Sequence, residues 1–215
     1  MKRKMFLLVA VVGALATAAI AAAAVITGTP GNDVLRGTDQ ADRISAFAGN
    51  DLVYARDGAD DVRAGAGNDG VRAADGSDLV YGGRGNDVVA GGDGSDRLYG
   101  GSDSDQVMGG EGNDRAAGNR GADAVFGNEG NDSLFGGWGP DRLFGAGGND
   151  ELHALAADDD PDLLNCGPGN DKAFVLRSER SRTQLVGCEV VFIVDALTAD
   201  QDEGENADAD TEADG

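Results

Sequence analysis

Two consecutive nonapeptides, GGRGNDVVA and GGDGSDRLY at residues 82–99, contain the pattern that decides the fold. Each has glycine at its first, second and fourth positions, aspartate at its sixth and an aliphatic residue at its eighth. Aspartate then recurs at every ninth position, fourteen times without interruption, from Asp33 to Asp150. A fixed period maintained over this length is the signature of a repeat architecture.

Residues at fixed distances from these aspartates indicate the structure of one repeat. The residue two positions after each aspartate is always aliphatic, and the residue four positions after it is always Gly or Ala. The residue two positions before it is glycine in twelve repeats, the exceptions being Gln40 and Asp103. One inward aliphatic side chain per repeat suits a strand of about three residues whose flanking side chains point outward. Glycine supplies the positive φ that the intervening turns need.

The sequence therefore predicts an all-β fold, a parallel β-roll or β-solenoid. Two strands and two turns close a coil of 18 residues, so the fourteen repeats give about seven coils, roughly 34 Å tall at the usual strand spacing. Two sides of different composition are expected, because the sixth residue after the aspartate is acidic in every second repeat from Asp39 to Glu129. This acidic column is interpreted as a solvated edge, the alternative being a site for further cations or a basic partner.

The overall composition, taken alone, is typical of a disordered chain. Glycine accounts for 36 of 215 residues, aromatic residues for 5%, and the formal net charge is −22, a combination that rarely forms a core. The strict phase of the aspartates contradicts disorder within the array. The shortage of Lys and Arg argues against nucleic-acid binding, which depends on cationic side chains that neutralise phosphates.

The stacked aspartates predict a metal. Carboxylates one strand spacing apart repel by about 0.9 kcal/mol in water and ~3.5 kcal/mol at an effective dielectric of 20. One buried aliphatic side chain per repeat contributes only about 1.5–3 kcal/mol, less than the cost of ordering nine residues at ~1–2 kcal/mol each. We therefore expect a cation between the coils. Carboxylate and carbonyl oxygens, with one histidine and two cysteines in the chain, favour Ca²⁺ over Zn²⁺ or Mg²⁺.

The array resembles the RTX, or hemolysin-type, calcium-binding repeat family, whose motif is GGxGxDxUx. Its first six positions are matched in full at residues 82–87, 91–96, 109–114 and 136–141, and the resemblance extends from Gly31 to about Asp171. It implies a parallel β-roll that holds Ca²⁺ between turns through the repeat aspartate and backbone carbonyls. The metal ligands implied are Asp33, Asp51, Asp60, Asp69, Asp78, Asp87, Asp96, Asp105, Asp114, Asp123, Asp132, Asp141 and Asp150. Weaker or empty sites are expected where alanine replaces the first glycine, at Ala46, Ala55, Ala64 and Ala73.

Residues 1–24 are typical of a cleaved signal peptide. Lys2, Arg3 and Lys4 precede an apolar stretch that ends in small residues, the order expected of an export signal. The alternative is an uncleaved anchor, because the stretch is long enough to span a bilayer. Both interpretations place the remaining chain outside the cytosol, and a secreted or cell-surface protein is expected.

The rest of the chain divides into three predicted parts. Residues 25–164 form the calcium-binding roll, residues 165–194 a capping segment, and residues 195–215 a disordered acidic tail with nine acidic and no basic residues. Cys166 and Cys188 lie in the cap. Two cysteines in an exported chain most simply form one disulfide, and secreted RTX-like proteins have similar cysteine-bearing ends. Two free buried thiols are the alternative.

Outward aromatic residues occupy the position three after the repeat aspartate. They are Tyr54, Tyr81, Tyr99, Phe126, Phe135 and Phe144. Ladders between neighbouring strands explain them without a ligand, and a partner-binding patch is the alternative.

Motifs for nucleotide binding or catalysis do not predict a function for this chain. The GxGxxG match at residues 65–70 lacks a βαβ unit, so nucleotide binding is not expected. His153 is the only histidine, so histidine-based metal sites and Ser-His-Asp triads are not expected in this chain, and His153 is interpreted as marking the end of the array. We expect a secreted, non-enzymatic calcium-binding module that folds on Ca²⁺ binding, with a structural or adhesive role and a cell-surface or matrix partner. The alternative is an accessory fragment of a secreted hydrolase such as a protease or lipase.

Overall fold

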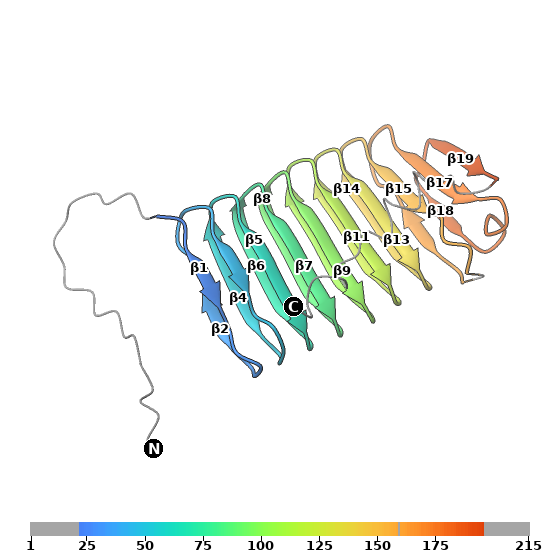
Figure 1. Cartoon of the computed structure of the whole chain (residues 1–215). Coiled ribbons are helices and arrows are strands. Elements are labelled where there is room, and N and C mark those ends of the chain that lie inside the picture. Colours follow the sequence, from blue (N-terminus) through green and yellow to red (C-terminus); the bar gives the residue numbers. More distant parts are fainter. Residues whose placement is uncertain (1–21, 159, 196–215) are drawn as a thin grey trace, which may run out of the picture.

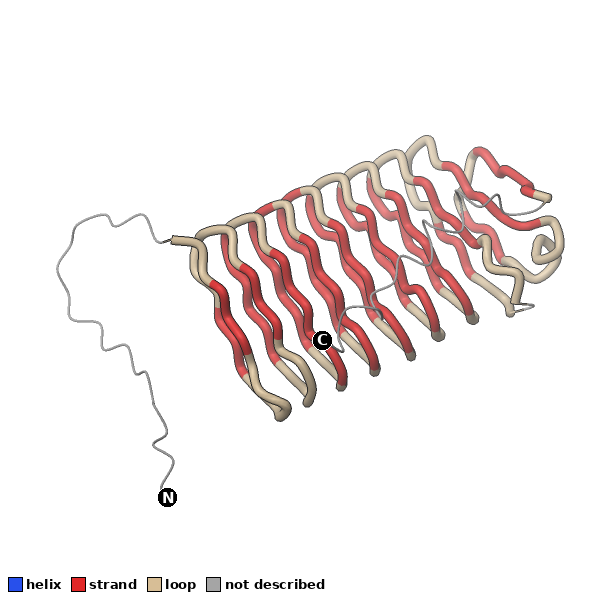
Figure 2. Tube along the Cα trace, viewed as in Figure 1, coloured by secondary structure: helices blue, strands red, loops and turns tan. Residues whose placement is uncertain are grey.

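The computed structural model describes residues 22–158 and 160–195, and within them it is built from strands and turns alone. The strands form two parallel sheets that face each other along a single stack of coils (Figures 1 and 2). The predicted signal peptide, apart from its last residues, and the predicted acidic tail beyond Asp195 lie outside the described residues. The all-β parallel solenoid expected from the nine-residue period is confirmed.

The first sheet, called sheet 1, contains the ten odd-numbered strands in chain order. They are β1 (Val25–Thr27), β3 (Arg43–Ser45), β5 (Asp61–Ala66), β7 (Leu79–Arg84), β9 (Arg97–Ser102), β11 (Arg115–Arg120), β13 (Ser133–Trp138), β15 (Glu151–Ala154), β17 (Lys172–Leu176) and β19 (Val190–Val194). The second sheet, called sheet 2, contains the nine even-numbered strands. They are β2 (Val34–Arg36), β4 (Leu52–Asp57), β6 (Gly70–Gly76), β8 (Val88–Gly94), β10 (Gln106–Glu111), β12 (Ala124–Glu129), β14 (Arg142–Gly147), β16 (Leu163–Asn165) and β18 (Gln184–Val186).

The stack is longer than the seven coils counted from the repeats. Ten strands in one sheet and nine in the other correspond to about nine coils, because β1 precedes the first repeat and β16 to β19 follow the last one. Within the array each residue pairs with the residue 18 positions later, as Val80 does with Leu98. Beyond it, Arg142 pairs with Leu163, so the three extra residues lie in a loop and the pairing continues. The predicted cap thus extends both sheets.

Most strands of the array contain six residues, twice the predicted length. Burial alternates along them, so the residue four positions after each aspartate points inward as well as the aliphatic residue at two. Val53 and Ala55 in β4 illustrate the two inward positions, being 1% and 0% exposed. The prediction of three-residue strands was wrong because a position restricted to Gly and Ala was interpreted as part of the turn.

The interior is a narrow column of aliphatic side chains between the two sheets. Ile44, Leu98, Leu134, Leu143 and Leu152 are all fully buried in it. Each coil adds two such side chains, and the small residues at the second inward position let the sheets approach at the turns. The core therefore repeats coil by coil, with contacts only between neighbours in the stack.

Ladders of stacked rings cover part of the outer faces, as predicted. Tyr81 stacks on Tyr99 with ring centroids 5.0 Å apart, and Phe126 stacks on Phe144 at 4.9 Å. His153 continues such a ladder between Phe135 and Phe174. Burial lowers the pKa of His153 to about 4, so this histidine is neutral at pH 7 and packs as an aromatic ring.

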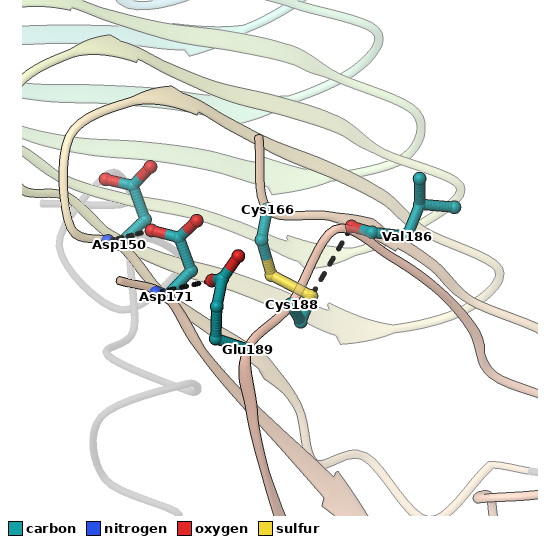
Figure 3. Close-up of a disulfide and its surroundings, with 6 residues drawn as sticks. All are labelled: Asp150, Cys166, Asp171, Val186, Cys188 and Glu189. Carbon is teal, nitrogen blue, oxygen red and sulfur yellow. Dashed lines mark hydrogen bonds between the residues drawn. A yellow bond between two sulfur atoms is a disulfide. The ribbon is translucent and has the colours of Figure 1, made fainter. Parts of the chain in front are cut away.

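The disulfide between Cys166 and Cys188 is present, with their Cα atoms 5.1 Å apart. It joins the residue after β16 to the residue before Glu189, at the C-terminal end of the stack (Figure 3). Cys166 is completely buried and belongs to the core. The cross-link therefore closes the end of the hydrophobic column.

Candidate calcium sites between the coils

The repeat aspartates form two continuous ladders, one along each edge of the stack. From Asp51 onward, the Oδ1 atom of each repeat aspartate accepts a hydrogen bond from the backbone N–H of the repeat aspartate one coil earlier. Asp105 accepts from Asp87 at 2.7 Å on one edge, and Asp114 accepts from Asp96 at 2.8 Å on the other. Aspartates 18 residues apart therefore stack directly, as the sequence predicted.

The second carboxylate oxygen of these residues has no partner among the described residues. The buried, unpartnered Oδ2 atoms are those of Asp51, Asp60, Asp69, Asp78, Asp87, Asp96, Asp105, Asp114, Asp123, Asp132, Asp141, Asp150 and Asp171. Burying an ionised carboxylate without a partner is strongly unfavourable. Each of these oxygens must therefore take up a proton or coordinate a cation when the coil closes.

The first glycine of the motif leaves space for such a cation beside the free oxygen. A Cβ atom added to Gly82 would lie 2.6 Å from Oδ2 of Asp87 and 2.5 Å from the backbone oxygen of Gly100 in the next coil. A carboxylate oxygen and a carbonyl oxygen thus converge on the space that a side chain would fill, and we call this space the cradle. Hard oxygen donors of this kind suit Ca²⁺, so the residues present fit the metal predicted from the sequence.

The second and fourth glycines of the motif bring neighbouring coils close together. Gly83 and Gly85 have φ values of +116° and +112°, in the left-handed region that favours glycine. A Cβ atom on Gly85 would come within 2.7 Å of the carbonyl carbon of Gly67 in the preceding coil. These glycines let the turns stack closely enough for carbonyl and carboxylate oxygens of adjacent coils to surround one ion.

Alanine fills the cradle in the N-terminal part of the array. Ala46, Ala55, Ala64 and Ala73 occupy the first position of their turns and are completely buried. Their Cβ atoms take the space that is open at the equivalent glycines of later turns. Glycine holds this position before the alanines, at Gly28 and Gly37, and again in every repeat from Gly82 to Gly145, where an added Cβ atom would lie against Oδ2 of the repeat aspartate.

In the first two turns a threonine donates hydrogen bonds to the Oδ2 atom of the repeat aspartate. Oδ2 of Asp33 accepts hydrogen bonds from the backbone N–H and the hydroxyl of Thr29, at 2.6 and 2.9 Å. Thr38 makes the equivalent bonds to Asp42. Asp33, one of the metal ligands that the family resemblance implies, therefore differs from the twelve others, because its Oδ2 atom accepts two hydrogen bonds whereas theirs has no partner among the described residues.

The aspartate ladder continues beyond the residues identified from the sequence. Asp150 donates its backbone N–H to Oδ1 of Asp171, and Asp171 donates to a carboxylate oxygen of Glu189 (Figure 3). On the other edge Asp141 donates to Asp162. The motif-like CGPGND at residues 166–171 signals Asp171, whereas no sequence pattern marks Glu189. In the Asp171 turn the first position is held by Cys166 instead of glycine.

An asparagine ladder with the opposite hydrogen-bond direction runs beside the aspartates. Oδ1 of Asn50 accepts from the backbone N–H of Asn68 in the following coil, and Asn68 accepts from Asn86 in the same way. Ser104 ends this ladder by accepting from Ala122. The next residue in the column is Pro140, which has no N–H to donate.

The ladder resumes on the opposite edge in the second half of the stack. Asn113 accepts from Asn131, and Asn131 accepts from Asn149. Each asparagine oxygen needs an N–H in the next coil, so the ladder must be continuous on one edge but can change edges between coils. Because the asparagines change from one edge to the other, almost every coil has one asparagine whose Oδ1 atom accepts a backbone N–H from the next coil.

Burial and mutual repulsion shift the ionisation of the ladder. Burial, reinforced by neighbouring carboxylates, raises the pKa of Asp105 and Asp141 to about 9 and that of Asp78 and Asp87 to about 7. The metal-free fold therefore retains protons on its aspartates at neutral pH.

Without calcium, β-structure is expected to be more stable at about pH 5 than at about pH 8. The raised pKa values make the folded chain bind more protons than the unfolded chain, whose aspartates titrate near 3.9. This stabilisation is complete below the unfolded pKa and is lost as the pH rises through about 6 to about 9. Circular dichroism in EGTA at a series of pH values measures it. Loss of β-structure on acidification through this range would contradict the predicted direction.

The two ladders, the glycine turns and the buried carboxylates define a solenoid of the calcium-binding β-roll class. A family profile described as the RTX calcium-binding nonapeptide repeat matches at residues 27–62, 37–71, 54–89, 72–107, 81–116, 108–143, 117–152 and 135–173. These matches cover more than half of the chain, which therefore belongs to the RTX calcium-binding nonapeptide repeat family, whose repeats bind Ca²⁺ as a structural ion. A search of curated proteins finds no match. Among the described residues there is no helix long and apolar enough to cross a membrane.

Proposed function

We propose that this protein is a secreted structural or adhesive module that folds on binding extracellular calcium and has no catalytic activity. The observation that carries the proposal is the double column of buried aspartates, each with one oxygen hydrogen-bonded to the stack and the other unpartnered. Such columns cannot be buried and ionised without cations. The proposed ligands are the predicted aspartates with open cradles, together with the carbonyl oxygens of their turns.

Metal binding and folding are coupled in this arrangement. Each cradle is formed by oxygens from two coils, as Asp87 and Gly100 show, so it does not exist in the unfolded chain. When bound, Ca²⁺ neutralises the stacked carboxylates and joins adjacent coils, and the protein's own groups position its ligands. The binding free energy then becomes folding free energy.

The environment outside the cell supports this coupling. Extracellular calcium modules typically bind at about 10⁻⁴–10⁻³ M, so the chain would remain unfolded in the cytosol and fold after export. Proteins with these repeats are typically secreted. The Cys166–Cys188 disulfide favours an oxidising compartment as well.

The proposed absence of catalysis is supported by the place of the single histidine. His153 lies between two aromatic rings, and its pKa is about 4, which makes it a poor general base at neutral pH. The aspartates with raised pKa values are held in the ladders.

A calcium titration of residues 25–215 followed by circular dichroism tests the proposed function. We expect little β-structure in EGTA at pH 8 and a cooperative gain at about 10⁻⁴–10⁻³ M Ca²⁺. Magnesium at the same concentration serves as the control and is expected to be far less effective, because it demands a smaller octahedral site. Identical spectra in EGTA and in calcium would refute calcium-dependent folding.

The proposed adhesive role is tested by measuring how much of the protein stays on the surface of the producing cell. Calcium-dependent retention of the protein on the surface of the producing cell, reversed by EGTA, is the expected result for an adhesive module. Complete release of the protein into the medium in the presence of calcium would contradict the adhesive role and favour a structural role in solution.

A further inference from the structure

Four adjacent strands in the middle of sheet 1 contain basic and aromatic residues but no acidic ones. We call this surface the arginine–aromatic patch. It consists of Arg84, Arg97, Arg115, Arg120, Tyr81, Tyr99, Phe135 and Trp138, from β7, β9, β11 and β13. Such a run is unusual in a chain with 39 acidic and 17 basic residues. The two strands that flank it, β5 and β15, include the acidic residues Asp61 and Glu151. At the edge of the patch, Asp158 and Asp160 line one hollow together with Arg120 and Trp138.

The patch carries concentrated positive charge. Arg97 and Arg115 are paired directly in register, an arrangement in which like charges destabilise a sheet. Among the described residues, Arg84, Arg97 and Arg120 form no ion pair with an acidic side chain. Sheet 2 has the opposite character at the corresponding strand ends, where Asp75 pairs in register with Asp93. The patch is therefore complementary to an acidic chain.

Its aromatic rings lie among the arginines, with Tyr99 and Phe135 buried at 8% exposure each. Tyr81 and Tyr99 stack, and the guanidinium of Arg115 lies 3.9 Å from the centroid of Phe135. Trp138 is 46% exposed and pairs in register with Arg120. Cationic groups held beside rings in this way can pair with carboxylates while their stems remain packed.

We propose that the acidic C-terminal segment of the same chain, residues 196–215, docks on the arginine–aromatic patch. The segment contains eight acidic and no basic residues, which complements the charge of the patch. It follows β19, the last strand of the same sheet. From β19 the patch begins three strands away at β13 and ends six strands away at β7, or about 14 to 29 Å.

The length of the segment matches this distance. A chain of twenty residues with random-coil dimensions spans about 25 Å on average, so the tether would place the segment over the patch at an effective concentration of the order of millimolar. An external polyanion would have to approach a molecule whose net charge is −22, which disfavours association. The tethered segment does not have to approach from solution, and it is therefore the favoured occupant.

Trp138 is the only tryptophan in the chain, so its fluorescence reports on the patch alone. The test compares acrylamide quenching of three proteins in calcium: the full chain, a tail-neutral variant and a patch variant. The tail-neutral variant changes Asp200, Asp202, Glu203, Glu205, Asp208, Asp210, Glu212 and Asp214 to Asn or Gln. The patch variant is Arg97→Gln with Arg120→Gln, and Arg72→Gln on sheet 2 is its matched control.

Quenching is expected to rise about twofold in the tail-neutral and patch variants, because one face of the indole ring loses its cover, and to stay unchanged in Arg72→Gln. Raising the salt from about 0.1 M to about 1 M, which shortens the Debye length from about 10 Å to about 3 Å, should produce the same rise in the full chain. A synthetic peptide of residues 196–215 should restore protection to the truncated chain 25–195.

Equal quenching of the full chain and the tail-neutral variant would overturn the proposal. Heparin binding of equal strength to both would also overturn it, by showing that the patch is open to an external polyanion. Circular dichroism in calcium identifies any variant that fails to fold. Failure of calcium-dependent folding would appear in that measurement, so the two proposals are tested separately.

Discussion

Replacing Gly91, Gly109 and Gly127 together by alanine should raise the calcium concentration at the folding midpoint about tenfold, equivalent to about 1.4 kcal/mol, and remove calcium from these three cradles on one edge of the stack. These glycines have ordinary φ values, so alanine is conformationally allowed and the effect comes from the added methyl groups. A Cβ atom at each would approach Oδ2 of Asp96, Asp114 or Asp132 and the carbonyl oxygen of the next coil. The cation and the methyl group would compete for the same space.

Native mass spectrometry and a calcium titration measure this result. The reciprocal variant Ala73→Gly opens a cradle in front of Asp78 and should add bound calcium, which tests the argument even if the triple variant folds poorly. Gly31→Ala is the matched control, because the nearest atom to its added Cβ would be the Thr29 hydroxyl at 3.9 Å. If the triple variant binds as many ions as the parent, the cradle is not the cation site.

The second large effect is expected in the core, where Leu134→Ala should destabilise the calcium-loaded protein by about 2–5 kcal/mol. Leu134 is 0% exposed in β13 and packs in register between Ala116 and Leu152. Each coil offers few inward side chains, so neighbouring coils cannot refill the cavity without breaking their own ladders. Urea denaturation in saturating calcium, followed by circular dichroism, measures the loss.

Leu52→Ala is the comparison for the core variant. Leu52 lies on the outer face of β4 and is 46% exposed, so its truncation should change stability by no more than about 0.5 kcal/mol. Equal destabilisation by the two substitutions would show that the inward and outward positions have been assigned wrongly. Repeat arrays can unfold in stages, so the midpoint of the first transition is the quantity to compare.

The architecture could be predicted from the sequence because its period is set by covalent spacing. The aspartates from Asp33 to Asp150 fix the coil length, and the aliphatic residue at two positions later fixes which face is inward. Stacking of alternate aspartates follows directly from these two facts. The aromatic ladders could be predicted in the same way, since Tyr81 and Tyr99 are 18 residues apart.

Features that depend on contacts between coils were not accessible in this way. A residue as small as Ala55 can occupy either an inward strand position or a turn, so its type does not distinguish the two. The strands were therefore predicted too short. The asparagine ladder could be seen in the sequence, but its change of edge depends on contacts between coils. Asn86 accepts from Ser104, and the proline two coils after Ser104 has no N–H to donate. Glu189 accepts the last hydrogen bond of its ladder from Asp171 and directly follows the disulfide-bonded Cys188.

The restriction of contacts to neighbouring coils has a mechanical consequence. A force that separates the ends of the chain loads the terminal coil alone, because the hydrogen bonds of each aspartate and asparagine reach only one coil away. Extension would therefore release the roll in increments of 18 residues, each adding about 60 Å of contour length. The Cys166–Cys188 bond withholds the residues between its cysteines from this extension. We therefore expect extension to begin at the N-terminal end of the stack and to proceed one coil after another.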